Sequence, residues 1–143
     1  MFRKLVPTMI MAAVLAGPVY AETFEVKMLN KNGSERMVFE PDFLRVAAGD
    51  TVVFIPTDKG HNAETVKGMI PEGAEPFKGK MNKEVSVTLT QDGVYGIECK
   101  PHYAMGMVMT IAVGDVSQAP DDFFAGRVPK KAKARFEEQL SNL

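Results

Sequence analysis

The order of apolar and polar positions along the chain predicts a fold built mostly of short β-strands. Alternation of the two classes, the period of a strand with one buried face, recurs through the first three quarters of the sequence. Turn-forming pairs such as Gly49-Asp50 and Asp92-Gly93 separate the runs. Seven or eight short strands at this spacing predict a β-sandwich or a β-barrel. The predicted strands lie at residues 24–28, 37–39, 43–46, 51–55, 85–89, 94–99 and 107–113, and the segment 57–81 is less regular.

The pattern changes from that of strands to that of helices at about residue 119. Residues 119–124 contain Pro120 followed by two aspartates, which is typical of a helix start. Between residues 130 and 143, Ala132, Phe136, Leu140 and Leu143 recur at helical spacing among mostly charged residues. We therefore expect two terminal helices, the second with one apolar stripe against the sandwich. The basic run 130–135 is interpreted as a solvated helix face in preference to a membrane or partner site.

The first 21 residues have the pattern of an export signal. Arg3 and Lys4 precede a mostly apolar stretch at 5–16, and Val19 and Ala21 occupy the usual cleavage positions. The stretch is too short for a transmembrane helix, and an uncleaved anchor or a disordered tail is the alternative. We expect residues 1–21 to be removed and residues 22–143 to form a single domain with a helical extension from about 119.

Charge and cysteine content narrow the function classes. The chain has 17 basic and 18 acidic residues, so it lacks the basic excess of a general nucleic-acid binder. It contains a single cysteine. In an oxidising compartment a lone cysteine is buried, reactive or bound to a metal, because paired cysteines form disulfides there.

Three metal-binding side chains fall close together in the sequence, and a fourth lies upstream. Cys99, His102 and Met107 share one short segment, and His61 is the other histidine of the chain. One thiolate, two imidazoles and a thioether are the ligand set of a blue-copper centre. A structural zinc site usually has four cysteine or histidine ligands, and this chain has three such residues. With Met107 filling the fourth position no place is left for substrate, which favours one-electron transfer over catalysis.

Strand geometry predicts that the four donors meet. Alternate residues of a strand share a face, so Cys99 points inward if Ile97 does. Pro101 ends regular pairing, and the chain then turns back into the strand that begins at Met107. His61 follows the strand 51–55, so it reaches the same end of the fold.

These residues and their spacing resemble the cupredoxins and, among them, the pseudoazurin subfamily, over nearly all of residues 22–143. The resemblance includes Phe54-Ile55-Pro56-Thr57-Asp58-Lys59-Gly60-His61-Asn62 and Pro101-His102-Tyr103. It implies an all-β, eight-stranded Greek-key sandwich with two C-terminal helices, and one type 1 copper bound by His61, Cys99, His102 and Met107. It also implies that Asn62 forms a hydrogen bond near the thiolate and ties the two ligand loops together.

The resemblance further implies a monomeric electron carrier in the periplasm of a Gram-negative bacterium. Such a carrier is neither an enzyme nor a membrane protein, and it takes electrons from a c-type cytochrome or another donor. It delivers them to a redox enzyme of denitrification, notably copper nitrite reductase.

Electrons are expected to pass through the edge of His102, inside an apolar rim that a partner covers on docking. The candidate rim residues are Met37, Pro56, Pro101, Ala104 and Met105, although Met105 is equally compatible with inward packing. Nearby lysines would steer an acidic partner. The candidates are Lys31, Lys59, Lys78, Lys80 and Lys100, of which the first three match the basic ring of the family, whereas Glu98 stands where another lysine is expected.

Two other functions are compatible with parts of the sequence. A periplasmic copper chaperone or copper store would use methionines, and Met105, Met107 and Met109 lie close together. An enzyme would use Cys99 as nucleophile and His102 as its base. Blue colour on addition of Cu(II) distinguishes the electron carrier from both.

Overall fold

The computed structural model describes residues 13, 16–17 and 20–143 of the chain. Most of the predicted export signal, residues 1–21, lies outside the described residues, so that assignment stays a prediction. Within the described part of the chain, no helix has both the length and the apolar character needed to cross a membrane.

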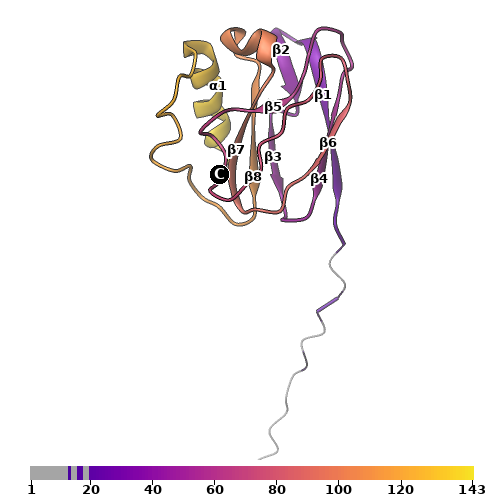
Figure 1. Ribbon diagram of the computed structural model, residues 1–143, viewed down its shortest axis with the longest axis vertical. Helices are drawn as coiled ribbons and strands as arrows, with labels where there is room; N and C mark the ends of the chain where they lie inside the picture. Colours follow the sequence, from indigo (N-terminus) through magenta and orange to yellow (C-terminus); the bar gives the residue numbers. More distant parts are fainter. Residues whose placement is uncertain (1–12, 14–15, 18–19) are drawn as a thin grey trace, which may run out of the picture.

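Two four-stranded sheets form the body of the protein (Figure 1). Their strand orders are β2-β1-β4-β6 and β3-β8-β7-β5. Each sheet contains one parallel pair, β1 with β4 and β3 with β8, and its other pairs are antiparallel. The predicted β-sandwich is confirmed, and its Greek-key connectivity stays an expectation. The strands are β1 (Thr23–Asn32), β2 (Glu35–Glu40), β3 (Phe43–Val46), β4 (Thr51–Ile55), β5 (Glu64–Thr65), β6 (Val85–Thr88), β7 (Gly93–Glu98) and β8 (Val108–Val113).

The core between the sheets is made by alternate residues of facing strands. In β1, Val26 and Met28 are fully buried while the intervening Lys27 is exposed. Phe54 of β4 and Ile97 of β7 fill the space between the two layers. This is the period-two pattern from which the strands were predicted, and it fixes the register because a shift by one residue would expose the core face.

Strand β8 is buried on both faces and joins two separate cores. Its residue Ile111 lies in the core between the sheets, which we call the sandwich core. Val108 lies in a second cluster, which we call the helix core, formed by Val66, Met69, Val94, Val108, Phe123, Ala132 and Phe136. Covering both faces explains why β8 is apolar at every position but Thr110 rather than alternating.

Helix α1 (Lys130–Leu140) closes the helix core and confirms the second predicted terminal helix. Its fully buried positions are Ala132, Phe136 and Gln139, and Leu140 and Leu143 of the predicted stripe pack against the helix core while partly buried. The Gln139 amide is satisfied in this position. Its Oε1 accepts from the Thr110 hydroxyl at 2.9 Å, and its Nε2 donates to the Val108 carbonyl at 3.0 Å.

The first predicted terminal helix, starting at residues 119–124, is wrong. The chain there forms only turns, with Phe123 N–H donating to Pro120 O and Ala125 N–H donating to Asp122 O. Gly126 and Pro129 follow too soon for the turns to extend into a helix. The segment is held by tertiary packing, because the Phe123 ring lies 6.1 Å from the ring of Phe136.

Loops that are distant in sequence meet at one end of the sandwich, the upper end in Figure 1. The 3₁₀ helix η1 (Lys100–Met105) lies there, as does the turn between β1 and β2. The start of β1 lies at the opposite end. We call the end with η1 the upper pole and the other end the lower pole.

Candidate metal centre

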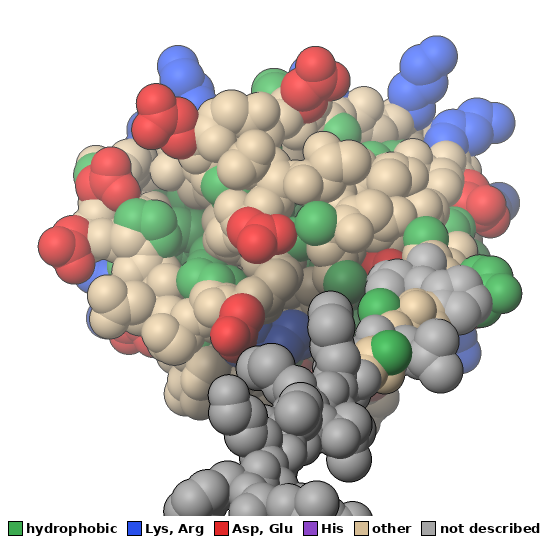
Figure 2. Space-filling model, turned by 90° about the horizontal axis from the view of Figure 1, so that it is seen from below, with side chains coloured by type: hydrophobic (Ala, Val, Ile, Leu, Met, Phe, Trp, Pro, Cys, Tyr) green, Lys and Arg blue, Asp and Glu red, His purple; other side chains and the backbone are tan. Residues whose placement is uncertain are grey.

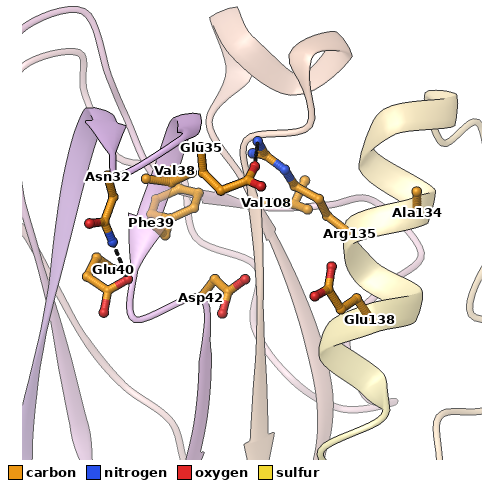
Figure 3. Close-up of a pocket in the computed structure, with 10 residues that line it drawn as sticks. All are labelled: Asn32, Glu35, Val38, Phe39, Glu40, Asp42, Val108, Ala134, Arg135 and Glu138. Atoms are coloured by element: carbon orange, nitrogen blue, oxygen red, sulfur yellow. Dashed lines mark hydrogen bonds and ion pairs between the residues drawn. The ribbon is translucent and has the colours of Figure 1, made fainter.

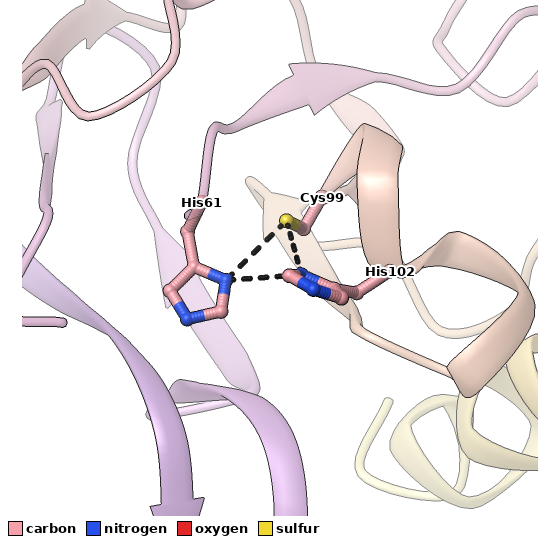
Figure 4. A group of neighbouring side chains, drawn as sticks. All are labelled: His61, Cys99 and His102. Atoms are coloured by element: carbon pink, nitrogen blue, oxygen red, sulfur yellow. Dashed lines mark hydrogen bonds between the residues drawn. The ribbon is translucent and has the colours of Figure 1, made fainter. Parts of the chain in front are cut away.

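Three of the four predicted ligands meet at the upper pole (Figure 4). The Cys99 Sγ atom lies 3.6 Å from Nδ1 of His61 and 3.5 Å from Nδ1 of His102. The two Nδ1 atoms are 3.2 Å apart. Cys99 and His61 are fully buried, and His102 is partly exposed. Residues far apart in the sequence thus direct one sulfur and two nitrogens toward a common point.

Cys99 takes its position from the end of β7. It follows the strand directly, and its side chain shares the buried face with Tyr95 and Ile97, as the alternation predicts. Its backbone N–H donates to the carbonyl of Met107 at 3.0 Å, which closes the loop between β7 and β8.

The loop from Cys99 to Met107 is compact and bonded to itself. Pro101 stands in the first turn of η1, where its missing N–H costs no helical bond. The His102 N–H donates to Cys99 O, and the Met107 N–H donates to His102 O, each at 3.1 Å. Gly106 ends η1 with a φ of 89°, a left-handed conformation that favours glycine. Met107, the fourth predicted ligand, is fully buried in the sandwich core together with Cys99.

His61 comes from the loop between β4 and β5 and is oriented by a residue of β1. Its Nε2 lies 2.8 Å from Oδ1 of Asn30. Because an amide oxygen only accepts, Nε2 carries the hydrogen and Nδ1 keeps a free lone pair facing Cys99. An outer contact of this kind fixes the tautomer of a metal ligand. Sequence reasoning missed Asn30, since nothing in its strand pattern marks a contact to a residue so far along the chain.

Asn62 connects the two ligand loops. Its Oδ1 accepts from the backbone N–H of Lys100 at 2.8 Å, and its Nδ2 donates to the carbonyl of Gly79 at 3.2 Å. Asn62 is next to His61 and Lys100 is next to Cys99, so one side chain ties together the segments that carry two donors. The backbone N–H of Asn62 also bonds to the Cys99 sulfur.

Electrostatics in the centre suit a bound cation. Burial raises the pKa of the Cys99 thiol, while hydrogen bonds from the backbone of Asn62 and His102 act in the opposite direction. Burial, followed by the proximity of His102, lowers the pKa of His61. An uncharged imidazole is a metal ligand, whereas a buried thiol with a raised pKa is a poor nucleophile until a cation replaces its proton. The centre therefore favours metal binding over covalent catalysis by Cys99.

The donor set fits copper. Two imidazole nitrogens and one thiolate sulfur are the in-plane ligands of blue-copper sites, with a thioether as the weak axial partner. The sequence contains no further cysteine or histidine that would complete a four-ligand structural zinc site. Met107 and Met109 are fully buried, so they do not form the exposed methionine surface of a copper store.

Several predicted docking residues surround the centre. Met105 is 44% exposed, which makes it a surface residue rather than a packing residue. Asn62, Lys78, Lys80, Met81, Lys100 and Pro101 help to line a groove of about 620 Å³ beside the Cys99–Met107 loop. Lys31 and Lys59 are also exposed, while Met37 and Pro56 are partly buried.

Glu98 differs from the lysines around it because it is buried. Its carboxyl group lies 3.4 Å from the Lys100 ammonium, and Glu98 is paired with Glu64 across strands β7 and β5. Burial is the main cause that raises the pKa of Glu98 to about 7, and the neighbouring Glu64 carboxyl group adds to it. The ion pair with Glu98 offsets part of the charge that Lys100 presents to a partner.

Comparisons with known proteins agree with this donor set. Residues 26–114 match the copper binding proteins of the plastocyanin/azurin family. A pseudoazurin from Paracoccus pantotrophus is 46% identical over 129 residues, covering 90% of this chain and 89% of the relative. The solved structure of a pseudoazurin from Sinorhizobium meliltoi has a TM-score of 0.76 at 44% identity, covering 84% of this chain and 94% of that one. Pseudoazurin from Methylobacterium extorquens AM1 gives the same TM-score at 40% identity, covering 84% and 98%.

The matched region contains all the donors described above, and the relative and the two solved structures named here are pseudoazurins. The chain therefore belongs to the plastocyanin/azurin family of copper-binding proteins and, within it, to the pseudoazurins, which carry electrons with one type 1 copper and are not enzymes.

Proposed function

We propose that His61, Cys99, His102 and Met107 bind the copper, and that the protein carries single electrons to a periplasmic redox enzyme such as copper nitrite reductase. The observation that carries the ligand assignment is the convergence of Nδ1 of His61, Sγ of Cys99 and Nδ1 of His102. Met107 completes the set because it ends the same loop and is buried in the same core.

The bound copper supplies the Cu(I)/Cu(II) couple, and the residues around it keep its ligands in place. An electron carrier works fastest when little moves between its two states. The bonds within the Cys99–Met107 loop, the contact of His61 with Asn30 and the link through Asn62 restrict that movement. Three of the four ligands are fully buried, and only His102 is partly exposed. The His102 ring is therefore the route by which electrons enter and leave.

Docking on the upper pole is supported by its exposed side chains. Met105 and Pro101 offer apolar surface next to His102, and the groove beside them carries three lysines. The lower pole differs, since Figure 2 shows acidic side chains scattered over its visible part and basic ones mostly at its margin. Such an asymmetry orients the molecule in the field of an acidic partner and speeds encounter at low salt. Lys31, Lys59, Lys78, Lys80 and Lys100 are the proposed steering residues.

The proposed location rests on the sequence. Residues 1–21 have the pattern of an export signal, so a mature chain of residues 22–143 would act in the periplasm as a single-domain monomer. A c-type cytochrome or a similar protein is the proposed donor. A lone thiol is compatible with this oxidising compartment when a metal binds it.

A spectrum of the copper-loaded mature protein tests the proposed centre. Added Cu(II) should produce an intense blue colour and the spin-resonance signal of a type 1 site, and Cys99→Ala should abolish both. A colourless or pale complex would exclude the ligand assignment. The partner is tested separately by measuring the rate at which the reduced protein delivers electrons to purified copper nitrite reductase. The control is a protein of the same net charge that lacks the lysine groove. If this protein delivered electrons to the reductase equally fast, copper nitrite reductase would be excluded as the specific partner.

A further inference from the structure

We propose that Arg135 of α1 is a positioning residue for the copper centre, because it clamps the Cys99–Met107 loop to the first residues of β2. This inference rests on the proposed role of Met107 as a ligand. It assigns a function to a residue of the basic run 130–135. From the sequence alone, that run is predicted to be a solvated helix face.

The contacts of the Arg135 guanidinium are the basis of the inference. Nη1 donates to Met37 O at 2.8 Å and to Gly106 O at 2.7 Å. Nη2 donates to Arg36 O at 2.9 Å and to a Glu35 carboxylate oxygen at 3.1 Å. Figure 3 shows the side chain reaching from α1 toward Glu35, across a cavity of about 330 Å³. One side chain, only 22% exposed, therefore joins three segments of the protein.

The first clamped segment has an unusual backbone conformation. Met37 has a φ of 52°, in the left-handed region that residues with side chains other than asparagine and aspartate rarely adopt. Such a conformation persists only where surrounding contacts hold it. The bond from Arg135 to the Met37 carbonyl is one such contact, and Met37 is one of the rim residues proposed for docking.

The second clamped segment leads directly into Met107, the proposed thioether ligand. A Cβ atom on Gly106 would lie 3.3 Å from Cδ of Arg135 and 3.3 Å from the Lys131 carbonyl, so α1 packs closely against this point of the loop. Gly106 precedes Met107, whose N–H in turn bonds to His102 O. A restraint on Gly106 is thus a restraint on the two ligands at the end of the loop.

Only arginine can make this set of bonds. Its guanidinium has five N–H donors in a rigid plane, whereas a lysine ammonium has three on a single atom. The axial ligand tunes the reduction potential of a blue-copper site. Loss of the clamp should therefore loosen Met107 and change both the visible spectrum and the reduction potential. The other three proposed ligands, His61, Cys99 and His102, should keep the protein blue.

Arg135→Gln and Arg135→Lys test the clamp. In both copper-loaded variants we expect a blue protein with a shifted ratio of visible absorption bands, an altered spin-resonance signal and a shifted reduction potential. In the copper-free proteins, amide hydrogen exchange at Gly106 and Met107 should be about tenfold faster than in the unsubstituted protein. Arg135→Lys keeps the charge and the aliphatic stem, so it provides the measurement if Arg135→Gln does not fold.

Two control variants separate positioning from stability. Phe136→Leu weakens the packing of the same helix in the helix core, and Glu35→Gln removes the ion pair but keeps an acceptor and the three backbone bonds. Both should leave the spectrum, the potential and the two exchange rates unchanged. Arginine variants with the spectrum, potential and exchange rates of the unsubstituted protein would overturn the inference. If instead the unsubstituted protein were not blue, the proposed function itself would fail.

Discussion

The two cores of this protein differ in what they hold. The sandwich core contains Cys99 and Met107, and His61 lies at its upper end, so it combines packing with the proposed metal ligands. The helix core contains none of the four proposed ligands and consists of apolar side chains under α1. They meet at β8, which contributes Met109, Ile111 and Val113 to the sandwich core and Val108 to the helix core. The comparison indicates that the proposed ligands depend on the sandwich core, whereas the helix core contributes stability through apolar packing.

Removing a large side chain from the helix core should lower the stability of the protein without changing the colour of its copper centre. Phe136→Ala leaves a cavity at the centre of that core, so we expect a loss of about 3–5 kcal/mol in the free energy of unfolding, measured by denaturant titration. The copper-loaded protein should stay blue while it is folded. Lys133→Ala, on the exposed face of the same helix, is the control and should cost less than about 0.5 kcal/mol. Loss of colour at temperatures well below unfolding would show that the helix core acts on the centre directly.

Asn62→Ala should change both the free energy of unfolding and the visible spectrum, because Asn62 lies where the sandwich core meets the ligand loops. It leaves the Lys100 N–H and the Gly79 carbonyl without their partner, at a cost of about 1–3 kcal/mol. The visible spectrum should also shift, since the two loops that carry His61 and Cys99 are no longer tied. Asn32→Ala removes an exposed side-chain bond to Glu40 and should change neither. An unshifted spectrum in Asn62→Ala would mean that the tie does not orient the ligands.

Tyr95→Phe probes the sandwich core far from the metal. The Tyr95 hydroxyl donates to Gln91 O at 2.7 Å, and we expect its removal to cost about 1 kcal/mol without a change of colour. Burial raises the pKa of Tyr95 above its ordinary value of 10.0. The neutral phenol therefore stabilises the fold fully below pH 10, and this contribution is lost as the pH rises through the raised pKa. The free energy of unfolding should therefore fall less steeply with pH above 10 in Tyr95→Phe than in the unsubstituted protein. An identical pH profile in both proteins would contradict the assignment to Tyr95.

A substitution outside both cores should have the smallest effect. The double variant Lys78→Gln, Lys80→Gln removes two charges from the groove and should leave the stability and the spectrum unchanged. We expect the rate of electron transfer to an acidic partner to fall several-fold at low salt, and the difference to fade as salt rises. Lys130→Gln with Lys133→Gln, on α1, is the charge-matched control. Equal electron-transfer rates for the two double variants would show that the groove is not part of the docking surface.

Most of the strands could be predicted from the sequence because their pattern is local. The period of two in β1, β4 and β6 reports directly which residues face the core. The two-residue strand β5 was not predicted, since it lies in the irregular segment 57–81 and exists only through pairing with β7. The helix expected at residues 119–124 failed for the opposite reason. Its local start signal is present, but Phe123 is held by packing on Phe136 rather than by helical bonds.

The cluster of His61, Cys99 and His102 could be predicted because copper demands particular side chains, and Met107 stays a proposed ligand. A single cysteine, two histidines and a suitably spaced methionine leave little choice of ligand set. The supporting residues could not be predicted in the same way. Asn30 and Arg135 act through contacts with residues remote in sequence, and neither residue type is diagnostic of a metal site. Such contacts depend on how the strands and α1 pack, which no local pattern records.

The direction of β1 determines which end of the protein faces outward when its N-terminus is attached to a surface. The strand begins at Thr23 at the lower pole and ends at Asn32 at the upper pole, a span of about 30 Å for its ten residues. Anything fused or tethered ahead of residue 22 is therefore attached at the end remote from His102. An engineered N-terminal anchor on an electrode or a bead would leave the copper end facing outward, free to meet its redox partners.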